Sequence, residues 1–247
     1  MNPKATFGQD GFVAVSGFCD AGELQTLETA LARFIAERVP ELPAEHVFYE
    51  DKADADTLKQ IQRMHEHDEF FGEFFEGKPK RLAEELLGEP AVGKNLQYFN
   101  KPPALGRATP PHQDGFYFML EPCRALTMWM ALDVVDEKNG CVRYVRHSHS
   151  RGMRPHARTK TLGFSQGITD FGQAFDARDE VACPARPGDL LAHHALTIHR
   201  ADANASATRT RRALGFVYYG ESAREDRAAH EAYQIKLTTE MEVAGEI

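Results

Sequence analysis

The sequence predicts a mainly β fold with flanking helices, and two observations carry this prediction. Residues 95–220 contain short apolar runs separated by turns, a spacing typical of an antiparallel sandwich or barrel. Residues 20–90 instead carry apolar residues at helical spacing, with capping residues at the helix ends. We therefore expect an N-terminal helical layer that supports one jelly roll, the double-stranded β-helix also found in cupins. We expect residues 1–247 to form a single domain of this kind.

The N-terminal region is expected to begin with a short strand and a long helix. The strand falls around Phe12–Val15, between two glycines. Asp20 then caps the helix, and Glu23, three residues later, completes a capping-box pattern. The buried face of this helix is marked by apolar residues at helical spacing: Leu24, Leu27, Leu31 and Phe34. Pro40 and Pro43 are expected to end it.

Further helices are expected after these prolines. Leu58, Ile61 and Met64 indicate a short one. Four phenylalanines follow at helical spacing: Phe70, Phe71, Phe74 and Phe75. We expect them to pack in the core, with the lining of a substrate pocket as the alternative. The next helix is expected between Pro79, which suits a first turn, and Gly88, which suits a C-cap.

The second half of the chain carries the strands of the expected jelly roll. Their predicted positions are Asn95–Phe99, Phe116–Leu120, Ala125–Val134, Gly140–Val145, Asp189–His194 and Ala213–Tyr219. A charged helix, outside the core, is expected over about residues 223–240.

Composition and charge argue against several classes of protein. Hydrophobic residues make up 42% of the chain and charged residues 27%, which is ordinary for a soluble enzyme. The net charge of -8 gives no basic footprint for nucleic acid, and no apolar run is long enough for a membrane span. No signal-peptide pattern is visible, and the four cysteines, without a Cys-x-x-Cys pair, are typical of free thiols in the cytoplasm. We expect a cytoplasmic protein with a small-molecule substrate, and the sequence does not predict its oligomeric state.

The stretch Pro110–Phe118 carries the clearest chemical signal. His112 and Asp114 are two residues apart, so on a strand their side chains would point to the same face. His199, in the late segment Leu196–Arg200, is the best candidate for a third ligand. Two histidines and one carboxylate that leave other positions open are the pattern of non-heme Fe(II) oxygenases. The alternative is that the His-x-Asp pair binds no metal, because so short a motif is common.

A series of short motifs follows the chain from end to end. They are Asp10-Gly11-Phe12-Val13, Asn100-Lys101-Pro102-Pro103, His112-Gln113-Asp114, Asn139-Gly140-Cys141, Pro187-Gly188-Asp189-Leu190, Thr197-Ile198-His199 and Arg211-Arg212-Ala213-Leu214. In this order and spacing they resemble the phytanoyl-CoA dioxygenase family of Fe(II)/2-oxoglutarate oxygenases. The resemblance implies a jelly-roll core and an enzyme that uses Fe(II), 2-oxoglutarate and dioxygen. It further implies hydroxylation of a small organic substrate, with succinate and CO₂ as coproducts.

The resemblance also implies roles for individual residues. It assigns the iron to His112, Asp114 and His199 as catalytic ligands, with 2-oxoglutarate chelating the metal and one position left for dioxygen. An aspartate ligand implies hydroxylation, because halogenating relatives carry a small residue there. The residues implied near the cosubstrate are Gln97, Trp129 and, more weakly, Thr127, which shares a strand face with Trp129. Core packing is the alternative for Trp129.

The distal carboxylate of 2-oxoglutarate needs a cation, and the family position implies Arg211. Arginine suits this role because its planar guanidinium can pair with a carboxylate through two hydrogen bonds. Strand alternation places Arg211 on one face and Arg212 on the other. Arg212 and Arg209 remain alternatives for the cation, and a solvated edge strand is the alternative for the whole cluster.

The chain departs from the family pattern at three places, one of which is the spacing from His199 to Arg211, one residue longer than the family implies. Relatives often have Gly-Ser directly after the second histidine, whereas this chain has Arg200 and Ala201. The family's Pro-Gly-Ser-His appears here as Arg146–His149, a segment that usually borders the active site. His194, five residues before His199, is expected to be a structural histidine.

Two other functions remain open at this point. One is a cupin-like metal-dependent isomerase or hydrolase without 2-oxoglutarate, and the other is a non-enzymatic small-molecule-binding module. The segment Ser150–Asp179 is expected to cover the pocket as a lid. Its basic residues hint at an acidic or phosphorylated substrate, with a solvated face as the alternative: Arg151, Arg154, Arg158 and Lys160.

Overall fold

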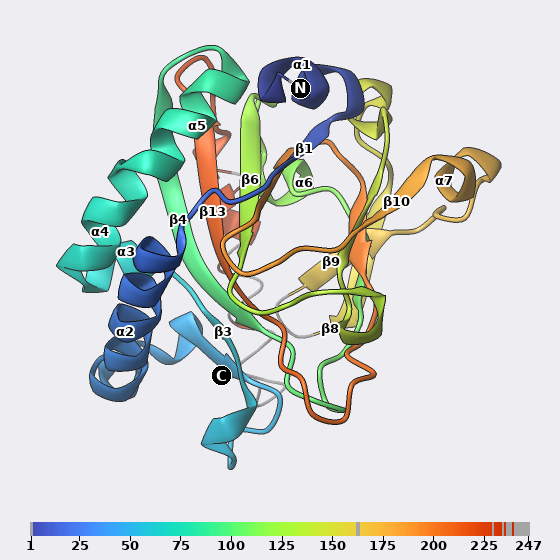
Figure 1. The fold of residues 1–247 in the computed structure, drawn as a ribbon. Helices are drawn as coiled ribbons and strands as arrows, with labels where there is room; N and C mark the ends of the chain where they lie inside the picture. The colour runs from blue at the N-terminus through green and yellow to red at the C-terminus, as the bar shows by residue number, and fades with distance from the viewer. Residues whose placement is uncertain (1, 162–163, 229, 234, 236–238, 240–247) are drawn as a thin grey trace.

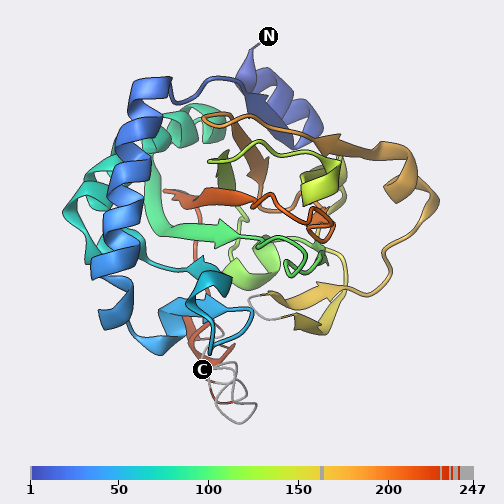
Figure 2. The same ribbon diagram turned by 60° about the horizontal axis from the view of Figure 1, so that its bottom comes forward.

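The computed structural model describes residues 2–161, 164–228, 230–233, 235 and 239. Two antiparallel sheets face each other, and most of the helices cover the outer side of the larger sheet (Figure 1, Figure 2). This mainly β arrangement with flanking helices confirms the predicted fold class. No helix of the described residues is both long and apolar enough to cross a membrane.

The larger sheet has the strand order β1-β11-β6-β13-β4-β3-β2. Its strands are β1 (Phe12–Val15), β2 (Val47–Tyr49), β3 (Leu58–Ile61), β4 (Ala91–Asn100), β6 (Ala125–Ala131), β11 (Leu190–His194) and β13 (Arg212–Gly220). Strand β13 lies between β4 and β6 and pairs with both of them, so the last strand of the core lies at the centre of this sheet.

The smaller sheet has the strand order β10-β7-β12-β5, and a separate hairpin pairs β8 with β9. The strands are β5 (Thr109–His112), β7 (Val142–Val145), β8 (His156–Thr161), β9 (Phe164–Ile168), β10 (Glu180–Cys183) and β12 (His199–Ala201). Apart from the β8–β9 hairpin, the strands from β4 to β13 divide equally between the two sheets. This is the jelly-roll arrangement that the alternation of short strands and turns predicted.

The predicted caps at Asp20 and Gly88 are confirmed, whereas the first predicted helix ends at Glu37, before Pro40, and the helices at Pro3–Asp10 and Ala174–Asp179 were not predicted. The helix bounds are α1 (Pro3–Asp10), α2 (Ala21–Glu37), α3 (Met64–His67), α4 (Glu69–Glu76), α5 (Lys78–Leu87), α6 (Gly115–Phe118) and α7 (Ala174–Asp179). Both bonds of the predicted capping box between Asp20 and Glu23 are present at the start of α2. Gly88 ends α5 in the left-handed conformation, with φ of 75°. Short 3-10 turns follow at Val39–Glu41, Ala44–His46, Ala55–Thr57, Glu137–Asn139 and Ser148–Arg151.

Two predicted elements are wrong. Leu58–Ile61 is a fully buried strand, β3, that pairs with β2 and β4, and only Met64 of the predicted helix is helical. Phe116–Leu120, predicted as a strand, contains the single-turn helix α6 and then Met119 in the left-handed conformation. Both errors have one cause: the periodicity of a short apolar run does not separate a buried strand from a buried helix.

The core has two main layers. One fills the space between the helices and the outer face of the larger sheet, and it contains the fully buried Phe71 and Phe75, which confirms their predicted packing role. The other lies between the two sheets and includes Trp129 and Tyr144. The predicted helix over residues 223–240 includes residues outside the described ones, so it stays a prediction.

Candidate metal centre

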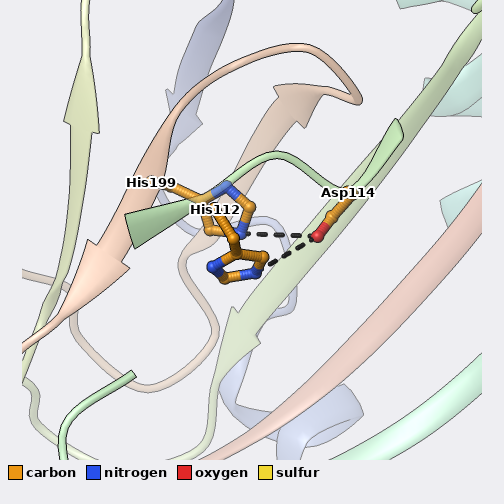
Figure 3. A group of neighbouring side chains, drawn as sticks. All are labelled: His112, Asp114 and His199. Carbon is orange, nitrogen blue, oxygen red and sulfur yellow. Dashed lines mark ion pairs between the residues drawn. The ribbon is translucent and has the colours of Figure 1, made fainter. Parts of the chain in front are cut away.

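The three predicted ligands meet between the sheets. His112 ends β5 and His199 begins β12, and the two residues are direct partners in the antiparallel pair of these strands. Their imidazole rings lie 4.1 Å apart between centroids. Asp114 Oδ1 is 3.4 Å from His112 Nε2 and 3.6 Å from His199 Nε2 (Figure 3). One ligand atom from each residue therefore lies within 4.8 Å of the others, close enough for one metal ion to touch all three.

The prediction that His112 and Asp114 converge because they share one face of a strand is wrong. His112 and Asp114 do not share a strand face, because β5 ends at His112. Asp114 instead has helical backbone angles, φ -60° and ψ -31°, at the start of α6. The turn between them, and not strand alternation, brings the carboxylate beside the imidazole.

Backbone contacts fix the tautomers of both imidazoles. His112 Nδ1–H donates to the carbonyl oxygen of Pro110 at 2.8 Å, and His199 Nδ1–H donates to that of Thr197 at 3.0 Å. Because a carbonyl oxygen only accepts, each Nδ1 carries the proton and each Nε2 presents a lone pair toward Asp114. A neutral imidazole oriented in this way is the form that binds metal ions.

The electrostatics of the cluster favour the same charge states. Burial and the neighbouring His112 and His193 hold the pKa of His199 well below its usual value, so the ring is neutral. Burial alone would raise the pKa of Asp114, but the neighbouring histidines outweigh it and hold this pKa well below its usual value. The result is an ionised Asp114 carboxylate beside the neutral imidazole of His199, charge states that suit a divalent metal site.

Arg211 differs from the two other candidate arginines. It is 5% exposed, and among the described residues no carboxylate lies within ion-pair distance of it. Its Nε donates to the carbonyl oxygen of Gly140 at 3.1 Å, and its guanidinium lies 4.9 Å from the ring centroid of Trp129. Burial lowers the pKa of Arg211 to about 10, so it remains a cation at neutral pH.

The alternatives to Arg211 are already paired. Arg212 forms ion pairs with Asp133 at 2.8 Å and with Glu28 at 2.9 Å, which tie the sheet to α2. Arg209 pairs with Asp136 at 2.8 Å. Only Arg211 of the three lines a cavity of about 710 Å³.

This cavity also brings together the other residues implied near the cosubstrate. The triad, Gln97, Trp129 and Thr127 all line it. Gln97 accepts a hydrogen bond from Gln60 at 2.9 Å, whereas Thr127 donates to Asp114 Oδ2 at 2.5 Å and so contacts one of the three predicted ligands directly.

Several lining residues were not predicted from the sequence. His193 contacts Asp114 Oδ2 through Nε2 at 3.0 Å, and the hydroxyl of Tyr144 lies 3.1 Å from His193 Nδ1. Lys59 is buried in the same wall and pairs with Glu50 at 3.2 Å. The alternation of β11 places His193 and Leu191 on one face, a signal that could have separated His193 from the structural His194. His194 contacts the backbone of Leu196 and the ring of Phe7, as expected of a structural histidine.

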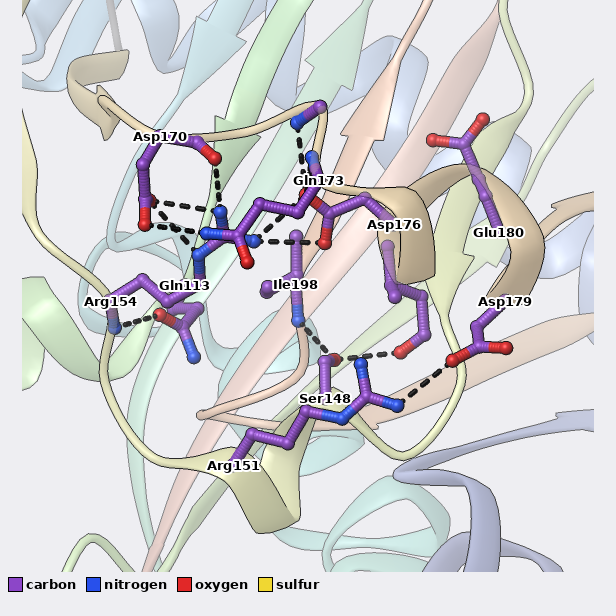
Figure 4. Close-up of polar contacts among 12 residues, drawn as sticks. Gln113, Ser148, Arg151, Arg154, Asp170, Gln173, Asp176, Asp179, Glu180 and Ile198 are labelled. Carbon is purple, nitrogen blue, oxygen red and sulfur yellow. Dashed lines mark hydrogen bonds and ion pairs between the residues drawn. The ribbon is translucent and has the colours of Figure 1, made fainter.

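The segment from residue 150 to 179 forms the β8–β9 hairpin and α7, and a polar network binds it to the turn between His112 and Asp114 (Figure 4). The side chain of Gln113, between two ligands, donates to the carbonyl oxygens of Gly152 and Leu196 and accepts from the backbone of Arg154. The hairpin also contacts the cavity wall, since the Tyr117 hydroxyl donates to the carbonyl oxygen of Gln166 at 2.9 Å.

Two of this segment's basic residues, Arg151 and Arg154, do not support its predicted preference for an acidic substrate. Arg154 pairs with Asp176 and Asp170, and Arg151 pairs with Asp179 at 2.8 Å (Figure 4). Because these charges are matched within the segment, they do not indicate an acidic substrate.

We expect Arg154→Ala to destabilise the protein by about 3–5 kcal/mol, because it leaves a buried carboxylate without its cation. Asp176 is 1% exposed and accepts from Arg154 Nη1 through both oxygens, at 2.8 and 2.9 Å. The matched control is Arg151→Ala, a more exposed pair expected to cost about 1 kcal/mol at most. Urea unfolding of both variants measures the difference, and equal losses would contradict the assignment of Arg154 as the anchor.

Comparison with known proteins agrees with this geometry. The sequence profile of the family described as phytanoyl-CoA dioxygenase matches residues 7–213. The peroxisomal phytanoyl-CoA dioxygenase of Mus musculus is 25% identical over 217 residues, which cover 83% of this chain and 64% of that protein. The phytanoyl-CoA dioxygenase of Arabidopsis thaliana is 30% identical over 175 residues, 65% of this chain and 60% of that protein. The chain thus spans less than two thirds of the length of these relatives.

Solved structures share the fold. The non-heme alpha ketoglutarate dependent epimerase SnoN from nogalamycin biosynthesis has a TM-score of 0.70 and 26% identity, over 90% of this chain and 84% of its own. SnoN has also been solved in complex with Fe3+, alpha ketoglutarate and nogalamycin RO. The profile match extends through β1, both metal-ligand motifs and the first residues of β13, and it shows that this chain belongs to the phytanoyl-CoA dioxygenase family.

Proposed function

We propose that the chain is an Fe(II)- and 2-oxoglutarate-dependent dioxygenase that hydroxylates a small organic substrate. The observation that carries this proposal is a single cavity lined both by the His112, Asp114 and His199 cluster and by the buried, unpaired Arg211. A metal-dependent isomerase or hydrolase that uses no 2-oxoglutarate would have no need of a buried cation without an anion.

The side chains fit the metal that this function requires. His112 and His199 would each offer an Nε2 lone pair, and Asp114 would offer one carboxylate oxygen. Two imidazoles and one carboxylate suit Fe(II) and leave coordination positions for 2-oxoglutarate and dioxygen. When bound, the iron and 2-oxoglutarate supply the oxidation, in which one oxygen atom of O₂ enters a substrate C–H bond and the other enters succinate as CO₂ leaves.

The cavity wall would hold 2-oxoglutarate by its charge. A buried guanidinium gains most from an anion, because the desolvation cost of Arg211 is already incurred in the folded protein. Trp129 keeps the guanidinium in place through a cation–π contact, whereas Lys59 in the same wall is already paired with Glu50. Gln97 and Trp129, on the cavity side of β4 and β6, are proposed to contact the cosubstrate between Arg211 and the metal.

Hydroxylation has to be distinguished from a second outcome of the same chemistry, epimerisation. SnoN is an epimerase, so a relative with this fold can finish the oxidation without adding oxygen to the product. The mass of the product decides between the two outcomes. A gain of one oxygen atom supports hydroxylation, whereas an unchanged mass with inverted stereochemistry indicates epimerisation.

We expect the Fe(II)-loaded protein to consume oxygen only when 2-oxoglutarate is added, and to form succinate in equal amount. Slow turnover without substrate is expected because such enzymes decarboxylate the cosubstrate uncoupled. An oxygen electrode and succinate quantification measure both quantities, and Zn(II)-loaded protein is the control. Conversion of a substrate that needs neither oxygen nor 2-oxoglutarate, or that proceeds with Zn(II), would favour the isomerase or hydrolase. Binding of a small molecule with no turnover under any of these conditions would favour a binding module.

A further inference from the structure

Asp114 presents its two carboxylate oxygens to different neighbours. Oδ1 faces the two imidazoles, at 3.4 and 3.6 Å from their Nε2 atoms. Oδ2 faces the larger sheet, where Thr127 Oγ1 lies at 2.5 Å and His193 Nε2 at 3.0 Å. One oxygen is therefore placed beside the metal-binding nitrogens, and the other has two hydrogen-bond partners of its own.

Both partners of Oδ2 come from one row of the larger sheet. His193 on β11 and Thr127 on β6 are direct cross-strand partners, so their side chains stand together on the face that looks at the smaller sheet. On the opposite sheet, His112, His199 and Tyr144 form the corresponding row across β5, β12 and β7. Asp114 lies between the two rows and contacts both.

Asp114 and Tyr144 contact opposite nitrogens of the His193 ring. Because an ionised carboxylate only accepts, His193 Nε2–H donates to Asp114 Oδ2. The hydroxyl of Tyr144 lies 3.1 Å from Nδ1 of the same ring and holds it from the other side. Tyr144 is fully buried and His193 is 3% exposed, so water does not compete for either contact.

We propose that Thr127 and His193 are positioning residues that occupy Oδ2 and leave only Oδ1 of Asp114 for the metal. A carboxylate held in this way binds through one oxygen, so the protein supplies three ligand atoms and not four. The position that a second oxygen would take stays open for the cosubstrate or dioxygen. This inference rests on the proposed metal site, but its test measures metal binding without turnover.

The test compares metal affinity in a set of small substitutions. Mn(II) is titrated into the metal-free protein, and free Mn(II) is measured by electron paramagnetic resonance. Thr127→Val keeps the side-chain shape but loses the donor, and we expect it to weaken Mn(II) binding by about ten- to a hundredfold. Thr127→Ser restores the hydroxyl and should recover most of the affinity. Thr57→Val is the matched control, because Thr57 is also buried and donates at 2.7 Å, to the backbone of Asp51 and away from the cavity.

The second arm separates a positioning role from a ligand role for His193. His193→Gln retains an amide donor toward Asp114 and should keep most of the affinity, whereas His193→Phe should lose it about as Thr127→Val does. The Co(II) absorption spectrum of Thr127→Val should show the higher coordination number expected once Oδ2 is released. Wild-type affinity and spectrum in Thr127→Val would overturn the inference. Complete loss of binding in His193→Gln would also overturn it, because His193 would then be a ligand.

A failure of this inference can be distinguished from a failure of the proposed function. If wild-type protein binds no Mn(II) or Fe(II), the metal site itself is wrong. If wild-type protein binds metal and the Thr127 variants match it, only the positioning role is wrong. Thermal unfolding of the metal-free variants shows whether each one is folded before its affinity is compared.

Discussion

Asp114→Ala is expected to abolish metal binding and 2-oxoglutarate-dependent oxidation together. The substitution removes the only carboxylate of the three-ligand cluster and leaves two neutral imidazoles for a divalent ion. It also leaves Thr127 and His193 without the acceptor that they share. Wild-type protein should be stabilised by about 2.7 kcal/mol when the metal is present at about 100 times its Kd. The variant should show no such stabilisation in thermal unfolding with Mn(II).

A stability control distinguishes loss of the metal site from general damage. Asp20→Ala removes the N-cap of α2 and should cost about 0.5–2 kcal/mol without changing the metal-dependent shift. Asp114→Asn keeps the shape of the side chain but not its charge, and it should also lose the metal. If Asp114→Ala retained both the metal-dependent shift and oxygen consumption, the triad would not be the metal site.

The histidines of the centre could be predicted because their signal is local. His112 follows two prolines and ends a strand, and His199 begins one after a short apolar run. The sequence predicted that Asp114 lies beside His112, but not the backbone conformation that places it there. That conformation is a turn into α6, which depends on packing of the aromatic run that follows. A sequence shows the spacing of two ligands, and the backbone that joins them is set by tertiary contacts.

The contacts of Asp114 depend on strand register, and the sequence does not reveal register. His193 and Thr127 are 66 positions apart and meet only because β11 pairs with β6 in one alignment. A shift of one residue would turn His194 toward the carboxylate and His193 toward the core. The same limit applies to β3, whose four buried residues show a pattern that fits a helix and a central strand equally well.

The alternation around Arg211 was more informative because it compared two adjacent residues where β13 begins. It separated Arg211 from Arg212 before any partner was known, and their partners differ as expected. Arg212 reaches outward to Glu28 on α2, and Arg211 reaches inward over Trp129. Asp133, which pairs with Arg212, and Asp136, which pairs with Arg209, lie in the loop after β6, and neither could be assigned to an arginine from the sequence.

Arg211→Ala is expected to raise the Michaelis constant for 2-oxoglutarate by about ten- to a hundredfold. A charge-assisted pair in a buried site contributes about 1.5–3 kcal/mol, and about 1.4 kcal/mol corresponds to a factor of ten. Fe(II) affinity should barely change, because Arg211 donates to Gly140 and contacts Trp129 but none of the three ligands. Arg211→Lys should fall between the variant and wild type, since it keeps the charge and loses the planar fork.

Arg212→Ala is the matched control for the cation, because it removes an equal charge from the next residue. This variant breaks the ion pairs with Asp133 and Glu28 and should lower stability, with the Michaelis constant for 2-oxoglutarate unchanged. Iron content and 2-oxoglutarate turnover, measured side by side on the three variants, test the assignment. If Arg211→Ala kept the wild-type Michaelis constant for 2-oxoglutarate and Arg212→Ala or Arg209→Ala raised it, the distal carboxylate would bind at one of those two arginines and not beside Trp129. If wild-type protein bound iron but no 2-oxoglutarate, the buried guanidinium would serve a different anion, and the metal site would belong to an isomerase or hydrolase.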